Sequence, residues 1–152
     1  MLKYDLVVIG GGPAGMAAAL KAKECGVKKI IILERAETLG GILEPCIHTG
    51  FGLQYFGAEL SGPEYAARFI EKVKETDIDV KVDTMVTEIR TGNIVVATNK
   101  VDGLLEITTT AIVLAMGCRE RPRGALDIPG SRASGIMTAG TAQKYVNIDG
   151  YM

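Results

Sequence analysis

The chain has 152 residues, with 17 lysines and arginines against 18 aspartates and glutamates and a formal net charge of −1, so it fits one compact domain and offers no strong charge to nucleic acid or an anionic membrane. Its apolar runs are far shorter than the about 20 residues that cross a bilayer, and no signal peptide is recognisable at its start, so we expect a cytoplasmic protein without a membrane span. Three cysteines without a C-x-x-C pair indicate reduced thiols, and no metal site is predicted.

The first predicted elements form a β-α-β unit around a glycine-rich turn. Residues 4–9 are apolar without alternation, a pattern typical of a parallel strand that is buried on both faces. A helix rich in Ala and Leu is predicted over residues 13–25, and a second apolar strand over residues 29–33. The glycines of the turn and the acidic residue after the second strand stand at the offsets of a dinucleotide-binding motif: Gly10, Gly12, Gly15 and Glu34.

Each residue of this motif has a physical role in holding a dinucleotide. Gly10 allows a sharp turn at the strand end, Gly12 lets a pyrophosphate approach the backbone, and Gly15 allows close packing of helix and strand. The helix that begins near Pro13 directs its free N–H groups and its positive dipole end at the phosphates. We expect Glu34 to accept hydrogen bonds from ribose hydroxyls and to repel a 2′-phosphate, which disfavours an NADP-type ligand.

The middle of the chain is predicted to contain a glycine-rich loop, a helix and a β-meander. The loop covers residues 35–60, and loops of this length are usually functional. The S-x-x-E pattern of residues 61–64 is typical of a capping box and predicts the start of an amphipathic helix. Predicted strands follow at residues 79–82, 86–90, 94–97 and 105–109, the last three as an antiparallel meander, and a separate parallel strand covers residues 111–115.

The composition changes after Gly117. Residues 118–134 include Pro122 and Pro129 and are predicted to form an extended connection, and a short helix is predicted over residues 138–146. The whole pattern predicts an α/β fold, a Rossmann-like domain that has a parallel sheet with helices on both faces and a three-stranded antiparallel meander.

The glycine turn and its surroundings resemble a known family. Residues 5–15, followed by Glu34-Arg35 and Gly40-Gly41, resemble the FAD-binding start of the pyridine nucleotide-disulphide oxidoreductase superfamily, flavoproteins that bind two dinucleotides. Residues 115–117, Ala-Met-Gly, resemble the second FAD motif of that superfamily, which is usually Ala-Thr-Gly. The resemblance implies FAD as the cofactor and implies these FAD-binding residues: Ile9, Gly10, Gly12, Pro13, Ala14, Gly15, Glu34, Arg35, Gly41, Ile42, Val86, Ala115, Met116 and Gly117.

The C-terminal part narrows the resemblance to one branch of the superfamily. Residues 117–122, 128–130 and 135–143 resemble the FAD/NAD-binding subunits of sarcosine oxidase, cyanide synthase, dye-linked amino-acid dehydrogenases and glycerol-3-phosphate-linked oxidoreductases. In these proteins the chain leads on to an NAD-binding domain and later returns to complete the FAD domain. The resemblance therefore implies a FAD-binding portion over residues 1–117 and a connection over residues 118–152, with partial FAD retention here and NAD(H) binding in the full-length protein.

The loop contains two candidate catalytic residues, Cys46 and His48. Disulphide reductases of the superfamily carry a C-x-x-x-x-C pair in this segment, but Phe51 stands where Cys46 would need its partner, so dithiol chemistry is not expected. A thiolate beside an imidazole would be reactive near the flavin. The alternative is that both side chains simply pack within the loop.

Three functions remain open from the sequence. The first is the FAD-binding portion of a flavin-dependent, NAD(H)-linked oxidoreductase, as the resemblance implies, with hydride transfer through the flavin. The second is a module without catalysis that binds NAD or another ADP-containing nucleotide, because both dinucleotides share the ADP moiety. The third is an assembly subunit that associates with a partner oxidase or dehydrogenase subunit or with copies of itself.

Overall fold

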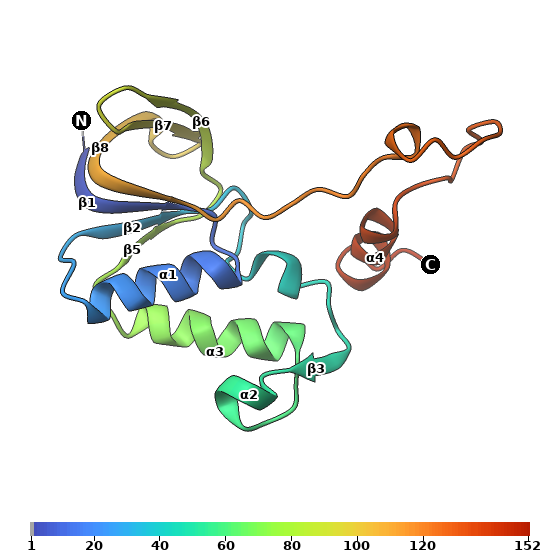
Figure 1. Ribbon diagram of the computed structural model, residues 1–152, viewed down its shortest axis with the longest axis horizontal. Helices are drawn as coiled ribbons and strands as arrows, with labels where there is room; N and C mark the ends of the chain where they lie inside the picture. The colour runs from blue at the N-terminus through green and yellow to red at the C-terminus, as the bar shows by residue number, and fades with distance from the viewer. Residues whose placement is uncertain (1) are drawn as a thin grey trace.

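A computed structural model describes residues 2–152, and a six-stranded mixed sheet forms its centre (Figure 1). The strand order is β5-β2-β1-β8-β7-β6. Strands β5, β2, β1 and β8 run parallel, and β8, β7 and β6 form an antiparallel meander. This arrangement agrees with the predicted α/β class. The strands of the sheet are β1 (Leu2–Ile9), β2 (Ile30–Leu33), β5 (Asp79–Lys81), β6 (Met85–Arg90), β7 (Ile94–Asn99) and β8 (Gly103–Leu114).

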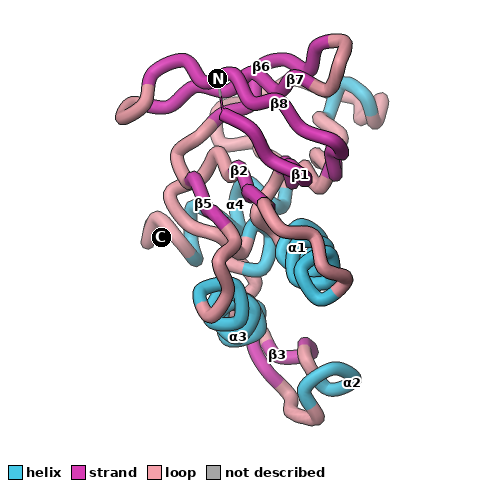
Figure 2. Tube along the Cα trace, turned by 90° about the vertical axis from the view of Figure 1, so that its left-hand side faces the viewer, coloured by secondary structure: helices cyan, strands magenta, loops and turns pink. Residues whose placement is uncertain are grey.

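The two long helices, α1 (Pro13–Glu24) and α3 (Gly62–Lys74), lie side by side against one face of the parallel strands (Figures 1 and 2). Every second residue of β1 and β2 points to this face, where apolar side chains of both helices cover it. Within residues 2–152, no helix is long and apolar enough to cross a membrane. The buried side chains of this layer are Leu6, Val8, Met16, Ala19, Ile30, Ile32, Leu39, Phe69, Val73 and Ile78.

The opposite face of the sheet is covered by the meander. The sequence predicted helices on both faces, whereas the part of the chain that the structure describes places its two long helices on one. The reason is that the meander curls back over the parallel strands (Figure 1) and buries the second face with its own alternating apolar residues. This second layer contains Val7, Ile9, Ile31, Leu33, Val95, Ala97 and Ile107.

Strand β8 is a single element of 12 residues where the sequence predicted two strands. Its first half pairs with β7 up to Thr108, and its pairing with β1 extends from Ile107 to Leu114. The polar run of threonines at residues 108–110 suggested a break between the strands. It is compatible with a continuous strand because β-branched residues suit extended backbone, and the Thr108 hydroxyl donates to the carbonyl of Leu2 at 3.1 Å.

The segment predicted as a loop over residues 35–60 contains short ordered elements: a 3-10 turn η1 (Gly41–Leu43), β3 (Thr49–Phe51), α2 (Leu53–Phe56) and the start of β4 (Leu60–Ser61). β3 and β4 pair as a small antiparallel sheet. The prediction of a continuous loop was wrong because the aromatic residues of this segment pack against α3, with ring centroids of Phe56 and Phe69 5.6 Å apart. The predicted capping box at the start of α3 is confirmed.

After β8 the chain extends away from the sheet, passes through a 3-10 turn η2 (Arg123–Ala125) and reaches α4 (Ala139–Asn147), five residues before the C-terminus (Figure 1). The Glu120 carboxylate accepts the Gly140 N–H at 2.8 Å and so fastens the connection to the start of α4. The end of α4 contacts the segment after η1, because the Asn147 side-chain amide donates to the carbonyl of Pro45 at 2.7 Å. Residues 102 positions apart are thereby joined.

Candidate functional site

The glycine turn lies where the carboxyl ends of β1, β2 and β8 meet. The Gly10 N–H donates to the carbonyl of Leu33, and the Ala115 N–H donates to the carbonyl of Ile9, both at 2.8 Å. Gly10 has a φ of 108°, a conformation that side chains disfavour. A Cβ on Gly15 would overlap the carbonyl oxygen of Gly10, so α1 packs directly against the turn. Gly10 therefore lies at the turn after β1, and Gly15 lies where α1 packs closely on that turn.

Helix α1 starts at this turn without a side-chain cap. Its preceding residue, Gly12, has extended backbone with no capping hydrogen bond, and the first helical bond runs from the Met16 N–H to the Gly12 carbonyl at 3.0 Å. Pro13 supplies no N–H, so the donors of the first turn are the amides of Ala14 and Gly15. Such an uncapped start directs N–H groups and the positive dipole end toward an anion.

The segment around Gly40 and Gly41 lies directly over the turn. The Gly40 N–H donates to the carbonyl of Gly11 at 2.9 Å. A Cβ on Gly41 would lie 3.1 Å from the Cα of Gly12, so the two backbones approach closely. Ile42 follows in η1 with an exposed side chain. The candidate residue Gly41 therefore lies beside Gly12, and the candidate Ile42 is the next residue along the chain.

Glu34 is buried at the centre of the site, with 7% of its surface exposed. Its Oε2 accepts the Gly11 N–H at 2.6 Å, and its Oε1 accepts the Ala36 N–H at 2.8 Å. Each carboxylate oxygen has a second acceptor position, so hydroxyl donors of a ligand can still be bound. Arg35, the next candidate, is exposed.

The remaining candidates lie around this centre. The Thr84 N–H donates to the Glu34 carbonyl at 2.8 Å, which brings the start of β6 and half-buried Val86 toward the end of β2. Ala115 is beside Gly10, and Met116 follows with its side chain exposed. Gly117 has a φ of 70°, where the chain leaves the sheet.

The structure does not pair Cys46 with His48. The Cys46 thiol donates to the Ile42 carbonyl at 3.2 Å, and the Gln143 amide nitrogen lies 3.8 Å from the sulfur. The Nδ1 of His48 lies 2.9 Å from the Thr49 carbonyl oxygen. Among residues 2–152 no hydrogen bond joins the thiol to the imidazole, and a catalytic role for either residue stays a prediction.

Two features of the site were not predicted from the sequence. Gly11 was given no role, although it contacts both Glu34 and Gly40; the three consecutive glycines at residues 10–12 were the available signal. The contacts of α4 with Pro45 and Cys46 were also missed. No local pattern signals them, because they join segments about a hundred residues apart.

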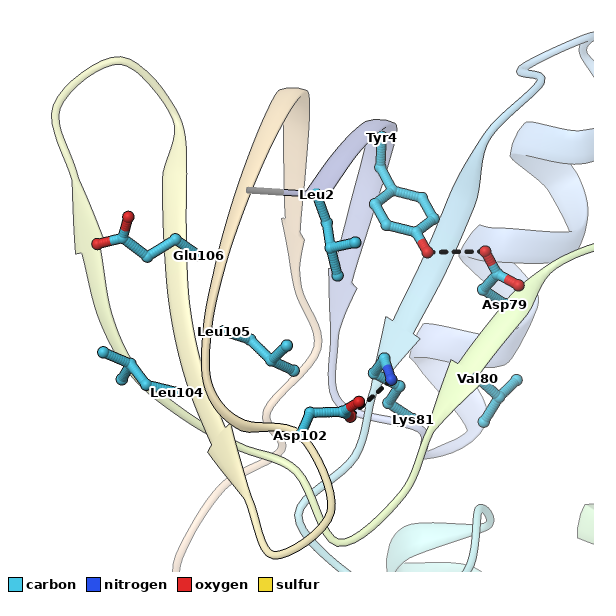
Figure 3. A pocket seen from close by; sticks show the side chains of 9 residues that line it. All are labelled: Leu2, Tyr4, Asp79, Val80, Lys81, Asp102, Leu104, Leu105 and Glu106. Atoms are coloured by element: carbon cyan, nitrogen blue, oxygen red, sulfur yellow. Dashed lines mark hydrogen bonds and ion pairs between the residues drawn. The ribbon is translucent and has the colours of Figure 1, made fainter.

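One groove lies apart from the glycine turn, between β1, β5 and the β7–β8 hairpin (Figure 3). Two contacts bridge it, from the Tyr4 hydroxyl to Asp79 and from the Lys81 ammonium to Asp102, each at 2.7 Å. Burial together with the hydrogen bond and charge of Asp79 raises the pKa of Tyr4 to about 12. The lining residue Glu106 pairs with Arg90 outside the groove, and none of the lining residues belongs to the turn.

A parallel sheet, an uncapped helix start after a glycine turn and a buried acidic residue at the neighbouring strand end define a dinucleotide-binding domain of the Rossmann type. Residues 4–148 match the family model of the pyridine nucleotide-disulphide oxidoreductases, and the chain belongs to this family of FAD-dependent oxidoreductases. The predicted family and the Rossmann-like class of the fold are thereby confirmed.

Curated relatives are similar over almost the whole chain. One of the subunits of opine oxidase from Agrobacterium tumefaciens is 33% identical over 162 residues, covering 98% of this chain and 30% of the relative. The HcnB subunit of hydrogen cyanide synthase from Pseudomonas protegens is 31% identical over 149 residues, covering 93% of this chain and 30% of the relative. The chain thus spans about a third of the length of these relatives.

A solved structure supports the fold. L-proline dehydrogenase from P. horikoshii superposes with a TM-score of 0.75 at 22% identity, covering 97% of this chain and 28% of that chain. At this level of identity the likeness concerns the fold, including the extended segment after β8.

Proposed function

We propose that this chain binds FAD through the ADP half of the cofactor, as the FAD-binding portion of an oxidoreductase that exchanges hydride between flavin and NAD(H). The observation that carries the proposal is the convergence at one sheet edge of the Gly10–Gly12 turn, the uncapped start of α1 and the buried Glu34 carboxylate. Membership of a family of FAD-dependent oxidoreductases adds independent support.

The residues of the site fit an ADP moiety by their chemistry. The Ala14 and Gly15 amides supply donors for the pyrophosphate, and Gly12 leaves its approach open, because a Cβ there would meet only the Gly41 Cα at 3.9 Å. Glu34 supplies acceptors for ribose hydroxyls. When bound, the flavin would supply the hydride chemistry, and the protein would supply its position.

We propose that residues 1–117 form the FAD-binding portion and residues 118–152 the connection to an NAD(H)-binding domain of a longer protein. The change from sheet to extended chain at Gly117 supports this boundary. Because the candidate residues would contact the ADP half of FAD, we expect FAD to bind weakly and incompletely. The purified chain should therefore carry little flavin, seen as weak absorption at about 450 nm, and should bind added FAD in equilibrium dialysis. Absence of any FAD binding at equilibrium would contradict the proposal.

A second candidate function is a nucleotide-binding module without catalysis. The observation that favours it is that the turn, α1 and Glu34 would contact only the ADP moiety, which NAD and FAD share. Competition between the two ligands separates the two functions. If the site is a FAD site, FAD should displace ADP at lower concentration than NAD does, whereas equal displacement by NAD would favour the general module.

We also propose that the protein is located in the cytoplasm.

We propose in addition that the chain associates with a partner subunit or with copies of itself. Strand β8 supports association, because its contacts on the β7 side end at Thr109 and Thr110, which are bonded to Asn93. Residues 111–114 then have β1 on one side and an open edge on the other. Leu114 on this edge is 58% exposed. Light scattering at several concentrations should show species above 16.1 kDa; a monomer at all concentrations would contradict self-association.

A further inference from the structure

Gly11, the middle glycine of the turn, is buried and held from three directions. Its N–H donates to Glu34 Oε2 at 2.6 Å, and its carbonyl accepts the Gly40 N–H at 2.9 Å. The Leu39 side chain covers its Cα, because a Cβ on Gly11 would overlap Leu39 Cδ2 and lie 3.1 Å from Glu34 Cβ. Hydrogen bonds and packing therefore fix the backbone of the turn at Gly11, between the motif residues Gly10 and Gly12.

The Glu34 side chain holds the Gly11 backbone from the neighbouring strand end. Its carboxylate joins the Gly11 N–H at 2.6 Å to the Ala36 N–H at 2.8 Å, and so ties the end of β2 to the turn after β1. The bond to Gly11 is buried, where a lost partner leaves an N–H unsatisfied. It also links residues 23 positions apart, so no local backbone bond replaces it.

We propose that Glu34 is a positioning residue: its carboxylate sets the backbone of the glycine turn through the Gly11 N–H, so diphosphate binding depends on Glu34 even when the ligand offers it no hydroxyl. This inference rests on the proposed function of the turn and adds a second role to the residue. One side chain then links ribose recognition to phosphate recognition. The free acceptor positions of the Glu34 carboxylate are available to ribose hydroxyls, and the same carboxylate holds the backbone of the turn that receives the diphosphate.

Glutamine is the sharpest substitution for Glu34, because it keeps the shape of the side chain. Its amide has one acceptor oxygen and one NH2 donor group. It can therefore accept from Gly11 or from Ala36 and must turn a donor toward the other. Glu37, an exposed carboxylate in the same segment, offers a matched control for the loss of one negative charge.

The test compares the Kd of ADP with that of 2′,3′-dideoxy-ADP, which lacks both ribose hydroxyls, for the wild type, Glu34→Gln and Glu37→Gln. We expect Glu34→Gln to weaken both ligands, and the dideoxy ligand by about tenfold. We expect Glu37→Gln to leave both values unchanged. The inference would be overturned if Glu34→Gln bound dideoxy-ADP like the wild type, since Glu34 would then act through hydroxyls alone. An equal loss in Glu37→Gln would overturn it too.

Amide hydrogen exchange of the ligand-free wild type provides a second test that needs no variant. The Gly11 amide should exchange much more slowly than the Ala14 amide in the uncapped first turn. Equal exchange at the two amides would overturn the inference. This measurement uses no nucleotide, so it tests the role of Glu34 even if the wild type binds no ADP. Absence of ADP binding by the wild type would contradict the proposed function instead.

Discussion

The Cα of Gly10 faces the carbonyl oxygen of Ala115 so closely that a β-carbon on Gly10 would overlap that oxygen. The Ala115 N–H also donates to the Ile9 carbonyl at 2.8 Å, so the end of β8 is fastened to the end of β1. The glycine turn and the Ala-Met-Gly segment, which are about a hundred residues apart in the sequence, therefore form one structural unit.

This contact predicts that Gly10→Ala destabilises the fold. The substitution adds a collision with Ala115 and places a side chain at a φ of 108°, a backbone conformation that costs about 1–3 kcal/mol. Thermal unfolding should show a lower Tm. Gly124→Ala is the control, because Gly124 has open space around its Cα and no positive φ. An unchanged Tm in Gly10→Ala would argue against the close approach of the two strand ends.

The contacts of α4 predict that Asn147 shields the segment of Cys46. Asn147→Ala removes the bond to the Pro45 carbonyl, and Gln143→Ala removes the amide beside the Cys46 sulfur. A hydrogen bond of this kind contributes about 0.5–1.5 kcal/mol, so a thiol reagent should modify Cys46 several-fold faster in the double variant. The comparison is made in a background of Cys25→Ser and Cys118→Ser, since both of these cysteines are exposed. Equal rates would show that α4 does not cover Cys46.

The attachment of α4 should also depend on pH through Glu120. Hydrogen bonds from the Thr138 side chain and from the backbone N–H groups of Gly140 and Thr141 lower the pKa of Glu120. A carboxyl whose folded pKa is depressed stabilises the fold above its unfolded pKa, about 4.3, and that contribution is lost as the pH falls through the folded value. The protection of the α4 amides, measured against their intrinsic exchange at each pH, should therefore fall below about pH 4. In Glu120→Gln this pH-dependent fall should be absent; its persistence would assign the effect to another group.

The capping box of α3 predicts a measurable loss of stability in Ser61→Ala. The Ser61 hydroxyl accepts the Glu64 N–H, and the Glu64 carboxylate accepts the Ser61 N–H at 2.7 Å. Removing the cap should cost about 1 kcal/mol of the free energy of unfolding. Ser131→Ala, in the exposed connection, should cost nothing measurable. Equal denaturant midpoints for both variants would show that the cap contributes no stability.

Local signals predicted the elements that carry the turn. The apolar runs before Gly10 and Glu34 specified parallel strands, and the S-x-x-E pattern specified the start of α3. What remained hidden depends on distant contacts. Val95 and Ile107 of the meander bury the second face of the sheet. Whether a helix or a curled meander covers that face depends on tertiary packing, which no local pattern reveals. The predicted ribose-binding side chain, Glu34, already holds Gly11 in the ligand-free chain, and spacing alone does not show which donor a carboxylate meets.

The central claim, that the glycine turn binds the ADP half of FAD, is tested most directly by the Kd of ADP for the wild type and for Gly12→Val. Gly12 is the position at which a diphosphate must approach the backbone, and a Cβ there meets no protein atom closer than the Gly41 Cα at 3.9 Å. We predict that Gly12→Val abolishes ADP binding while the Tm stays close to that of the wild type, and that Gly124→Val binds ADP normally. Unchanged ADP affinity in a folded Gly12→Val variant would contradict the account.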